Sequence, residues 1–224
     1  MGIGLSLVND KIGVHKNLNA MGSYAYHLAV SSSSWISFGL QAGINNRKSD
    51  YASLSSGSGN DPLVSTSGVA QTSFNVGAGV YFRSPRLQVG LSAPELIPEK
   101  SVVNDSMTIR WDKTSYFLFS KYRISLSDRI DLEPCILLKY FSGTPLSMDV
   151  NLSAVFYEAF SLGFSWRKDE SVDFLMRAKI TQQLQFGYAY DYPVGEIPQA
   201  GNGSHEIMLN YRFRFTYAKV DSPR

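Results

Sequence analysis

LQFGYAYDY, residues 184–192, is the stretch that decides the fold class, because large apolar or aromatic side chains occupy every second position. Gln, Gly, Ala and Asp fill the positions between them. Such alternation places the two kinds of side chain on opposite faces of a β-strand, whereas an amphipathic helix repeats every 3.6 residues. The stretch therefore predicts a strand with one apolar face and one polar face.

The same alternation of apolar and polar positions returns along the whole chain. We count about twelve such segments, most of them near the 9 to 11 residues that a tilted strand needs to cross a membrane. The clearest others cover residues 36–44, 74–82, 130–138, 146–156, 160–166 and 172–176. The periodicity predicts an all-β protein.

Composition narrows the class of function. The 224 residues contain no obvious linker, so we expect a single domain over residues 1–224. The formal net charge of +2 is spread along the chain, which gives nucleic acid no basic surface to bind. The lone Cys135 can make no internal disulfide and has no metal-ligand spacing around it. We expect no metal, no cofactor and no nucleic acid partner.

Residues 17–46 contain no charged side chain apart from His27, which invites the interpretation of a membrane helix. Polar residues and glycines interrupt them, so they lack the unbroken apolar run of about 20 residues that a spanning helix needs. Met1 opens directly onto alternating residues with no signal peptide ahead of them. We expect the signal peptide and the first two strands of the full protein to be missing from this chain.

Two features indicate that the apolar face meets lipid. Aromatic side chains gather near segment ends, as in the girdles of membrane barrels; they are Tyr140, Tyr157, Phe160, Trp166, Tyr190, Tyr192, Phe213 and Phe215. Connections also alternate in length. Tight ones are expected at residues 31–34, 84–86, 125–128, 158 and 181–182, and longer ones at 10–17, 47–71, 93–112, 141–144, 167–171 and 193–203.

Outer-membrane barrels place short turns in the periplasm and long loops outside. We therefore predict an antiparallel up-and-down transmembrane β-barrel in the bacterial outer membrane, with its carboxy terminus in the periplasm. The last strand supports this, because its apolar stripe ends in aromatic residues and suits recognition by the barrel-insertion machinery. That stripe is Ile207, Leu209, Tyr211, Phe213 and Phe215, and Met208, Asn210, Arg212 and Arg214 occupy the other face.

Charged residues of both signs are expected to face the barrel interior. They are Lys121, Arg123, Asp131, Glu133, Lys139, Asp149, Arg167, Asp173, Arg177, Lys179, Asp191, Arg212 and Arg214. We favour a salt-bridged, largely plugged lumen, since partly buried charges are normally paired. The alternative is a selective pore, for which a ring of one sign would be typical.

Two further candidate sites are weaker. Ser204, His205 and Glu206 are neighbours and Asp191 precedes them, yet neighbours in a strand point to opposite faces and cannot readily share a proton. We expect no catalytic residue and no enzyme. Calcium binding by Asp50, Asn60 and Asp61 lacks the spacing of a dedicated loop, so a flexible extracellular loop is the favoured interpretation.

Several phrases of the sequence resemble the PorP/SprF family of type IX secretion system membrane proteins, found in Bacteroidetes. The resemblance extends over essentially the whole chain, and the opening residues resemble the family's third strand and the loop after it. The phrases are GIGLS at 2–6, NDKIG at 9–13, YAY at 24–26, SFGLQAG at 37–43, GLS at 90–92, GTPLS at 143–147, GYAYD at 187–191 and GSHEIML at 203–209.

The resemblance implies a whole barrel of about 14 strands and a non-enzymatic role in protein export. A protein of this kind anchors or docks secreted proteins, including adhesins used in gliding motility. Its implied partners are outer-membrane lipids, periplasmic lipoproteins, peptidoglycan-binding OmpA-like proteins of the machine, and the carboxy-terminal domains of secreted cargo. The alternatives are a passive porin or solute transporter and, more remotely, a soluble β-barrel binding protein.

Overall fold

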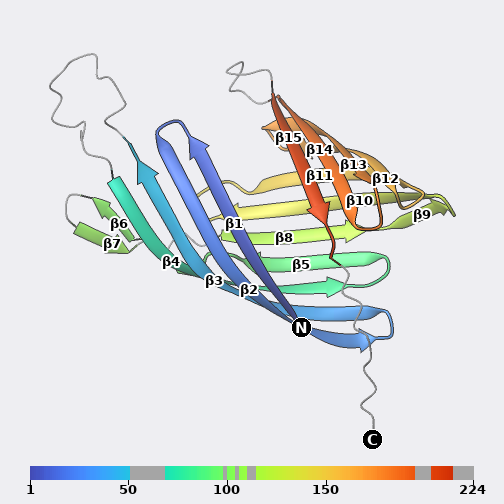
Figure 1. Ribbon diagram of the computed structural model, residues 1–224, viewed down its shortest axis with the longest axis horizontal. Helices are drawn as coiled ribbons and strands as arrows, with labels where there is room; N and C mark the ends of the chain where they lie inside the picture. Colours follow the sequence, from blue (N-terminus) through green and yellow to red (C-terminus); the bar gives the residue numbers. More distant parts are fainter. Residues whose placement is uncertain (51–68, 98–99, 104–105, 110–114, 195–202, 214–224) are drawn as a thin grey trace, which may run out of the picture. The chain divides into compact units, whose positions relative to one another are not determined.

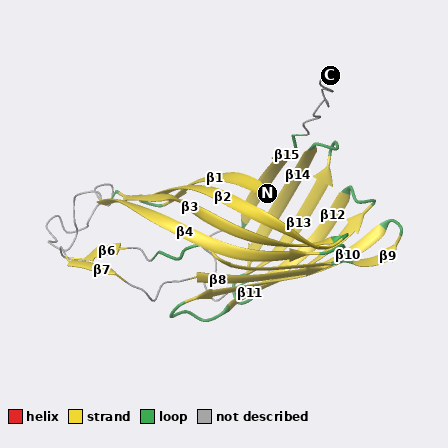
Figure 2. Cartoon of the chain, turned by 90° about the horizontal axis from the view of Figure 1, so that it is seen from below, coloured by secondary structure: helices red, strands yellow, loops and turns green. Residues whose placement is uncertain are grey.

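A computed structural model describes residues 1–50, 69–97, 100–103, 106–109, 115–194 and 203–213. Every regular element among them is a strand (Figure 2). No helix in these ranges is long and apolar enough to cross a membrane. Residues 17–46, the stretch that mimics a membrane helix, instead form most of two paired strands.

Long strands open the chain. They are β1 (Gly2–Ile12), β2 (His15–Ser31), β3 (Ser34–Ser49) and β4 (Val69–Arg83), followed by the shorter β5 (Leu87–Ala93), β6 (Lys100–Val103) and β7 (Ser106–Ile109). The second half holds β8 (Ser115–Tyr122), β9 (Ile124–Ser127), β10 (Ile130–Phe141), β11 (Ser147–Phe156), β12 (Phe160–Arg167), β13 (Ser171–Lys179), β14 (Leu184–Pro193) and β15 (Ser204–Tyr211).

Thirteen of these strands form one antiparallel sheet (Figure 1). Twelve follow one another in the order β1-β2-β3-β4-β5-β8-β10-β11-β12-β13-β14-β15, and β9 pairs with β10 off this path. The remaining two, β6 and β7, pair only with each other. Apart from β6 and β7 between β5 and β8, and β9 between β8 and β10, neighbours in the sheet are successive in sequence, which confirms the predicted up-and-down all-β architecture and its count of about twelve segments.

The chain divides into two compact units. The first comprises residues 1–120 and 138–146, and the second comprises residues 121–137 and 147–224. The expectation of one domain over the whole chain stays a prediction. Each unit shows the same inversion of the usual burial pattern.

In the first unit, register places apolar residues beside apolar ones, and polar beside polar, across β2, β3 and β4. Tyr24 lies opposite Leu40, and Leu40 lies opposite Ala78. The neighbouring positions on the other face pair Ser23 with Gln41. The apolar face is the exposed one: Leu40 is 65% exposed, while the polar-face Asn45 and Asn75 are only 5% and 4% exposed.

The second unit repeats this arrangement. Phe164 lies between Leu152 and Phe174 and is 63% exposed. On the opposite face, Asp173 and Glu133 are each 4% exposed. A water-soluble protein buries its apolar side chains and exposes its charges. Both units expose their apolar face and bury polar side chains on the other, as the predicted lipid-facing stripe requires, and the second unit also buries charges there.

Most connections agree with the predicted pattern of tight turns. Residues 32–33, 84–86, 157–159 and 180–183 each join two paired strands. Tyr157 and Glu158 both have a φ of 52°, which lets three residues reverse the chain between β11 and β12. The tight turn expected at residues 125–128 is displaced, because β9 extends to Ser127 and only residues 128–129 connect it to β10.

Two of the expected long loops are wrong. Residues 10–17 form a continuous hairpin that turns at Gly13 and Val14, with Ile12 opposite His15. Gly13 has a φ of +58°, the conformation that a two-residue hairpin turn with glycine first requires. Residues 168–170 connect β12 to β13 as tightly as the opposite turns do. Polar side chains suggested loops in both places, but here they belong to strands and a short turn.

The final strand is shorter than expected. Pairing of β15 with β14 ends where Leu184 meets Tyr211. Phe213 lies beyond the strand, with its ring 4.7 Å from the Tyr211 ring, and Phe215 lies outside the described residues. The strand thus ends before Phe213, although the Arg212 N–H still donates to the Gln183 carbonyl, and the insertion-signal stripe through Phe215 stays a prediction.

Candidate functional site

The polar face of the second unit forms the main candidate site. Successive strands present Asn151, Ser165, Asp173, Asp191 and Ser204 in adjacent register positions. Because directly paired residues share a face, these side chains lie on one surface. The polar residues at every second position of these strands thus form one continuous polar layer. No single stretch of sequence displays that layer.

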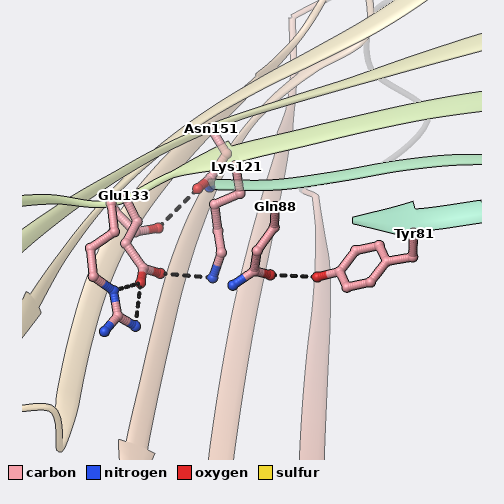
Figure 3. A network of polar contacts seen from close by, with 7 residues as sticks. Tyr81, Gln88, Lys121, Glu133 and Asn151 are labelled. Carbon is pink, nitrogen blue, oxygen red and sulfur yellow. Dashed lines mark hydrogen bonds and ion pairs between the residues drawn. The ribbon is translucent and has the colours of Figure 1, made fainter. Parts of the chain in front are cut away.

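Glu133 is the centre of one ion cluster on this face (Figure 3). Its carboxylate lies 3.1 Å from Lys121 Nζ and 3.0 Å from Arg123 Nη2. The Glu133 side chain is only 6% exposed, whereas those of Lys121 and Arg123 are 24% and 41% exposed. A carboxylate this buried needs opposite charge to stay ionised at low cost. β8 and the residue after it supply both cations at i and i+2, on one face of the chain.

Arg167 organises a second cluster. Its guanidinium lies 3.7 Å from Asp149, 3.6 Å from Glu170 and 3.8 Å from Asp173. Asp173 also accepts a 2.5 Å hydrogen bond from the Ser171 hydroxyl. One cation thus stands among three carboxylates, two of which are on neighbouring strands and one in the turn.

Asp173 of β13 lies directly opposite Asp191 of β14, so two carboxylates face each other in register. Asp191 accepts a 3.3 Å hydrogen bond from the Ser204 hydroxyl. Like charges opposite each other destabilise a sheet. Arg167, beside Asp173, offsets part of that repulsion.

A hollow of about 370 Å³ lies over this polar face. Its lining includes two cations, two carboxylates and small polar side chains: Lys121, Arg177, Glu133, Glu206, Asn151 and Ser161. Asn151 accepts a 2.9 Å hydrogen bond from the Ser153 hydroxyl (Figure 3). The hollow carries both signs of charge and can therefore bind water and paired ions better than one class of ion.

The other predicted interior residues are distributed differently. Asp131 pairs in register with Ser125, and Lys179 with Gln185. Lys139 belongs to the first unit, and Arg212 follows β15, where its backbone N–H donates to the Gln183 carbonyl at 2.7 Å. Arg214 lies outside the described residues. The structure therefore joins Lys121, Arg123 and Glu133 in one group and Asp149, Arg167 and Asp173 in another.

The first unit has a polar face, as the alternation at residues 36–44 and 74–82 predicts, but sequence reasoning did not single it out as a candidate site. It is uncharged for most of its length and rich in amides, with Asn19 opposite Asn45 and Gln41 opposite Gly77. Tyr81 donates a 2.6 Å hydrogen bond to Gln88 (Figure 3). A search restricted to charged residues overlooks this face, although the spacing of Asn, Gln and Ser at every second position would have found it.

The segment after β5 folds against this amide-rich face. Gln41 Nε2 donates to the Pro94 carbonyl at 2.9 Å, and the Leu96 N–H donates to Val76 at 2.8 Å. Gly77 makes room for the segment, because a Cβ there would lie 2.5 Å from the Pro94 oxygen. The face also carries a hollow of about 460 Å³ lined largely by glycine, serine and alanine.

The remaining candidates find no shared site. Ser204 pairs with Asp191 on the polar face, whereas His205 pairs with Tyr190 on the apolar face. His205 Nδ1 lies 2.8 Å from the Tyr188 hydroxyl. Within the described ranges no group of three or more His, Cys, Asp or Glu side chains is placed to hold a metal. Asn60 and Asp61 of the calcium hypothesis lie outside those ranges.

An up-and-down antiparallel sheet with an exposed apolar face and a polar opposite face, charged in its second unit, defines an all-β membrane protein. The model of the family described as type IX secretion system membrane protein PorP/SprF matches residues 1–211, so the chain belongs to that family. No curated protein matches the chain.

Proposed function

We propose that this protein is an outer-membrane β-barrel that serves the type IX secretion system as an anchor or docking scaffold, not as an enzyme. The observation that carries this proposal is the inverted burial of both units, with Leu40 65% exposed and Glu133 4% exposed. An apolar face exposed along the whole length of a strand is stable only when it contacts lipid. Membership of a family of type IX secretion system membrane proteins then supports a role of this membrane protein in that system.

The charged face supports a scaffold better than a porin. Glu133 is neutralised by two cations, and Arg167 stands among three carboxylates. Paired charges hold strands together and fill space, whereas a selective pore needs an excess of one sign. We propose that both units contribute to one domain whose polar faces form its interior, with the lumen largely plugged.

We base the proposed orientation on the longest connections, which join β3 to β4, β5 to β8 and β14 to β15. They leave the strand ends opposite to the turns at residues 32–33, 84–86, 157–159 and 180–183, although the tight turns at 13–14 and 168–170 share their side. Because long loops fit the cell exterior, we propose that the four opposite turns and the carboxy terminus are periplasmic. The periplasmic turns would meet lipoproteins and OmpA-like proteins of the machine. The opposite side would meet exported cargo, including adhesins in gliding bacteria of the Bacteroidetes. β15, with Ile207 and Leu209 more than 70% exposed, would carry the insertion signal.

A gene deletion tests the proposal. Loss of the protein should stop export or surface attachment of proteins that carry the secretion signal domain, and should leave the uptake of small solutes normal. The secreted proteins are compared by mass spectrometry between wild type, the deletion strain and a complemented strain. An unchanged secretome would defeat the scaffold function.

Planar bilayers test the porin alternative. Purified full-length protein should give no discrete conductance steps if paired charges fill its interior. A variant that removes Glu133 and Arg167 together serves as a positive comparison, because loosening both clusters should raise any conductance. Regular unitary steps in the wild-type protein would favour the passive pore.

A further inference from the structure

Three lysines form a row across the first three strands. Lys11 of β1 lies directly opposite Lys16 of β2, and Lys16 lies directly opposite Lys48 of β3. The turn at Gly13 and Val14 fixes this register. Neighbouring strands are about 4.8 Å apart, so three ammonium groups start from backbone positions within roughly 10 Å. All three side chains are exposed.

The row lies just beyond the apolar band, on the same face of the sheet. From the row toward the apolar band, the next register pair on this face is Leu18 with Asn46, and the pair after it is Ala20 with Ile44. Lys48 is four residues past Ile44, about 13 Å along an extended strand. Tilting of the strand shortens that height to roughly 10 Å. Because the headgroup region on each side of the hydrocarbon is about 5–8 Å deep, the row lies at the level of the headgroups when Ile44 is near the edge of the hydrocarbon.

Within the described ranges, no carboxylate forms an ion pair with the row. Among the described residues, none of the three lysines has an ion-pair partner. Asp10 is on the opposite face of β1, because its register partner is Asn17. Asp50 is the next acid along the chain, two residues after Lys48, and its N–H donates to the Val14 carbonyl at 3.0 Å.

Like charges directly opposite each other destabilise a sheet. Three lysines in register therefore need either a bound anion or another role that explains their presence. Protection of a sheet edge is one such reason, since lysines often blunt edges. It can account for Lys11 on the terminal strand of the path. It cannot account for Lys16 and Lys48, because β2 and β3 are paired on both sides.

We propose that the row of Lys11, Lys16 and Lys48 binds the phosphate groups of lipid A in the outer leaflet of the membrane. The inference rests on the proposed outer-membrane location. A lipid phosphate is favoured over free phosphate because the row continues the apolar face. Acyl chains attached to the bound phosphates would run along Leu7, Ala20 and Ile44, which share that face in register.

The test uses the purified full-length chain in non-ionic detergent, titrated with diphosphoryl lipid A and followed by native mass spectrometry. The row variant is Lys11→Gln/Lys16→Gln/Lys48→Gln. The matched control, Arg86→Gln/Lys168→Gln/Lys179→Gln, removes three exposed cations from other places. We expect the row variant to bind lipid A at least roughly tenfold more weakly, and the control to bind within about twofold of wild type.

Further arms separate the sources of phosphate. Lipid A stripped of its phosphates should bind wild type and row variant equally, and excess inorganic phosphate should not displace intact lipid A. A row variant that keeps full affinity would overturn the inference, as would displacement by inorganic phosphate. The arginine variant Lys11→Arg/Lys16→Arg/Lys48→Arg should retain binding, and the single variant Lys16→Gln provides a milder test if the triple variant fails to fold.

Heat-modifiable migration on a gel separates this inference from the proposed location. A wild-type chain that shows no heat-modifiable migration and stays in the aqueous phase after detergent partition would defeat the outer-membrane barrel. A chain that passes both measurements, but whose row variant holds lipid A as tightly as the control, would defeat the lipid site alone.

Discussion

The carboxylate of Glu133 lies 3.1 Å from the ammonium of Lys121, and the Glu133 side chain is only 6% exposed. Arg123 approaches the same carboxylate to 3.0 Å. Breaking a fully buried pair by removing one partner costs about 3–5 kcal/mol. Here the two cations remain partly solvated, so solvent screening lowers the value of the cluster.

We expect Glu133→Gln to reduce the free energy of unfolding by about 1–2 kcal/mol, because it leaves two neighbouring cations without their counter-charge. Urea unfolding in lipid vesicles measures the change. Lys121→Met should cost less, since Arg123 still neutralises Glu133.

A double-mutant cycle with Glu133→Gln and Lys121→Met isolates the pair from other effects of each substitution. A coupling free energy near 1 kcal/mol is expected for residues that share a charge cluster. Strict additivity of the two single effects would show that the observed contact contributes nothing.

Arg167→Gln should lower stability by about 1 kcal/mol, because Asp149 and Asp173 lose their common cation while Asp191 remains opposite Asp173. Adding Asp173→Asn should restore much of the loss. The asparagine removes one charge and can still accept the hydrogen bond from Ser171. Urea unfolding of both variants and of Arg86→Gln, a substitution of an exposed arginine in the turn at residues 84–86, gives the comparison. Failure of Asp173→Asn to rescue would contradict a role for carboxylate repulsion.

Much of the fold follows from sequence because alternation is a local property. The stretch at residues 184–192 contains its own two faces, and the structure places them as expected in β14. Connections were harder to predict. Residues 10–17 look like a polar loop, yet they form a hairpin whose lysines belong to paired strands.

The ion clusters could be predicted only as a set of residues. Lys121, Arg123 and Glu133 were expected on one face, but sequence does not say that β8 and β10 are neighbours in the sheet. The amide-rich face of the first unit was predicted as a polar face but not as a site, for a different reason. Asn45 and Asn75 carry no charge, and their burial becomes visible only when β2, β3 and β4 are assembled.

Gly77→Ala should destabilise the protein by about 1–3 kcal/mol, because the new methyl group would lie 2.5 Å from the Pro94 oxygen and 2.8 Å from Gln41 Cγ. Gly39→Ala is the matched control on the same face. A Cβ at Gly39 has no neighbour closer than 3.8 Å, so the change should be neutral or slightly stabilising. Limited proteolysis near residues 94–97 should increase only in Gly77→Ala. Equal behaviour of the two variants would show that the segment does not depend on the close approach at Gly77.

A charge placed on the apolar face distinguishes lipid from water as the medium around that face. Phe164 is 63% exposed and lies between Leu152 and Phe174, whereas Ser165 is on the polar face opposite Asp173. Phe164→Arg should therefore cost about 2–4 kcal/mol in lipid vesicles, the range for arginine near the membrane midplane. Ser165→Arg should cost less than about 1 kcal/mol, because it adds a cation beside a carboxylate.

The two variants differ by one position in sequence and add the same side chain, so the added side chain and the total charge are matched between them. In water, Phe164→Arg would change the free energy of unfolding little, because residue 164 would be exposed to solvent with either side chain. Unfolding free energies measured in vesicles therefore decide between the two media. If Phe164→Arg is no more costly than Ser165→Arg, the exposed apolar face does not meet lipid, and the membrane interpretation of the inverted burial fails.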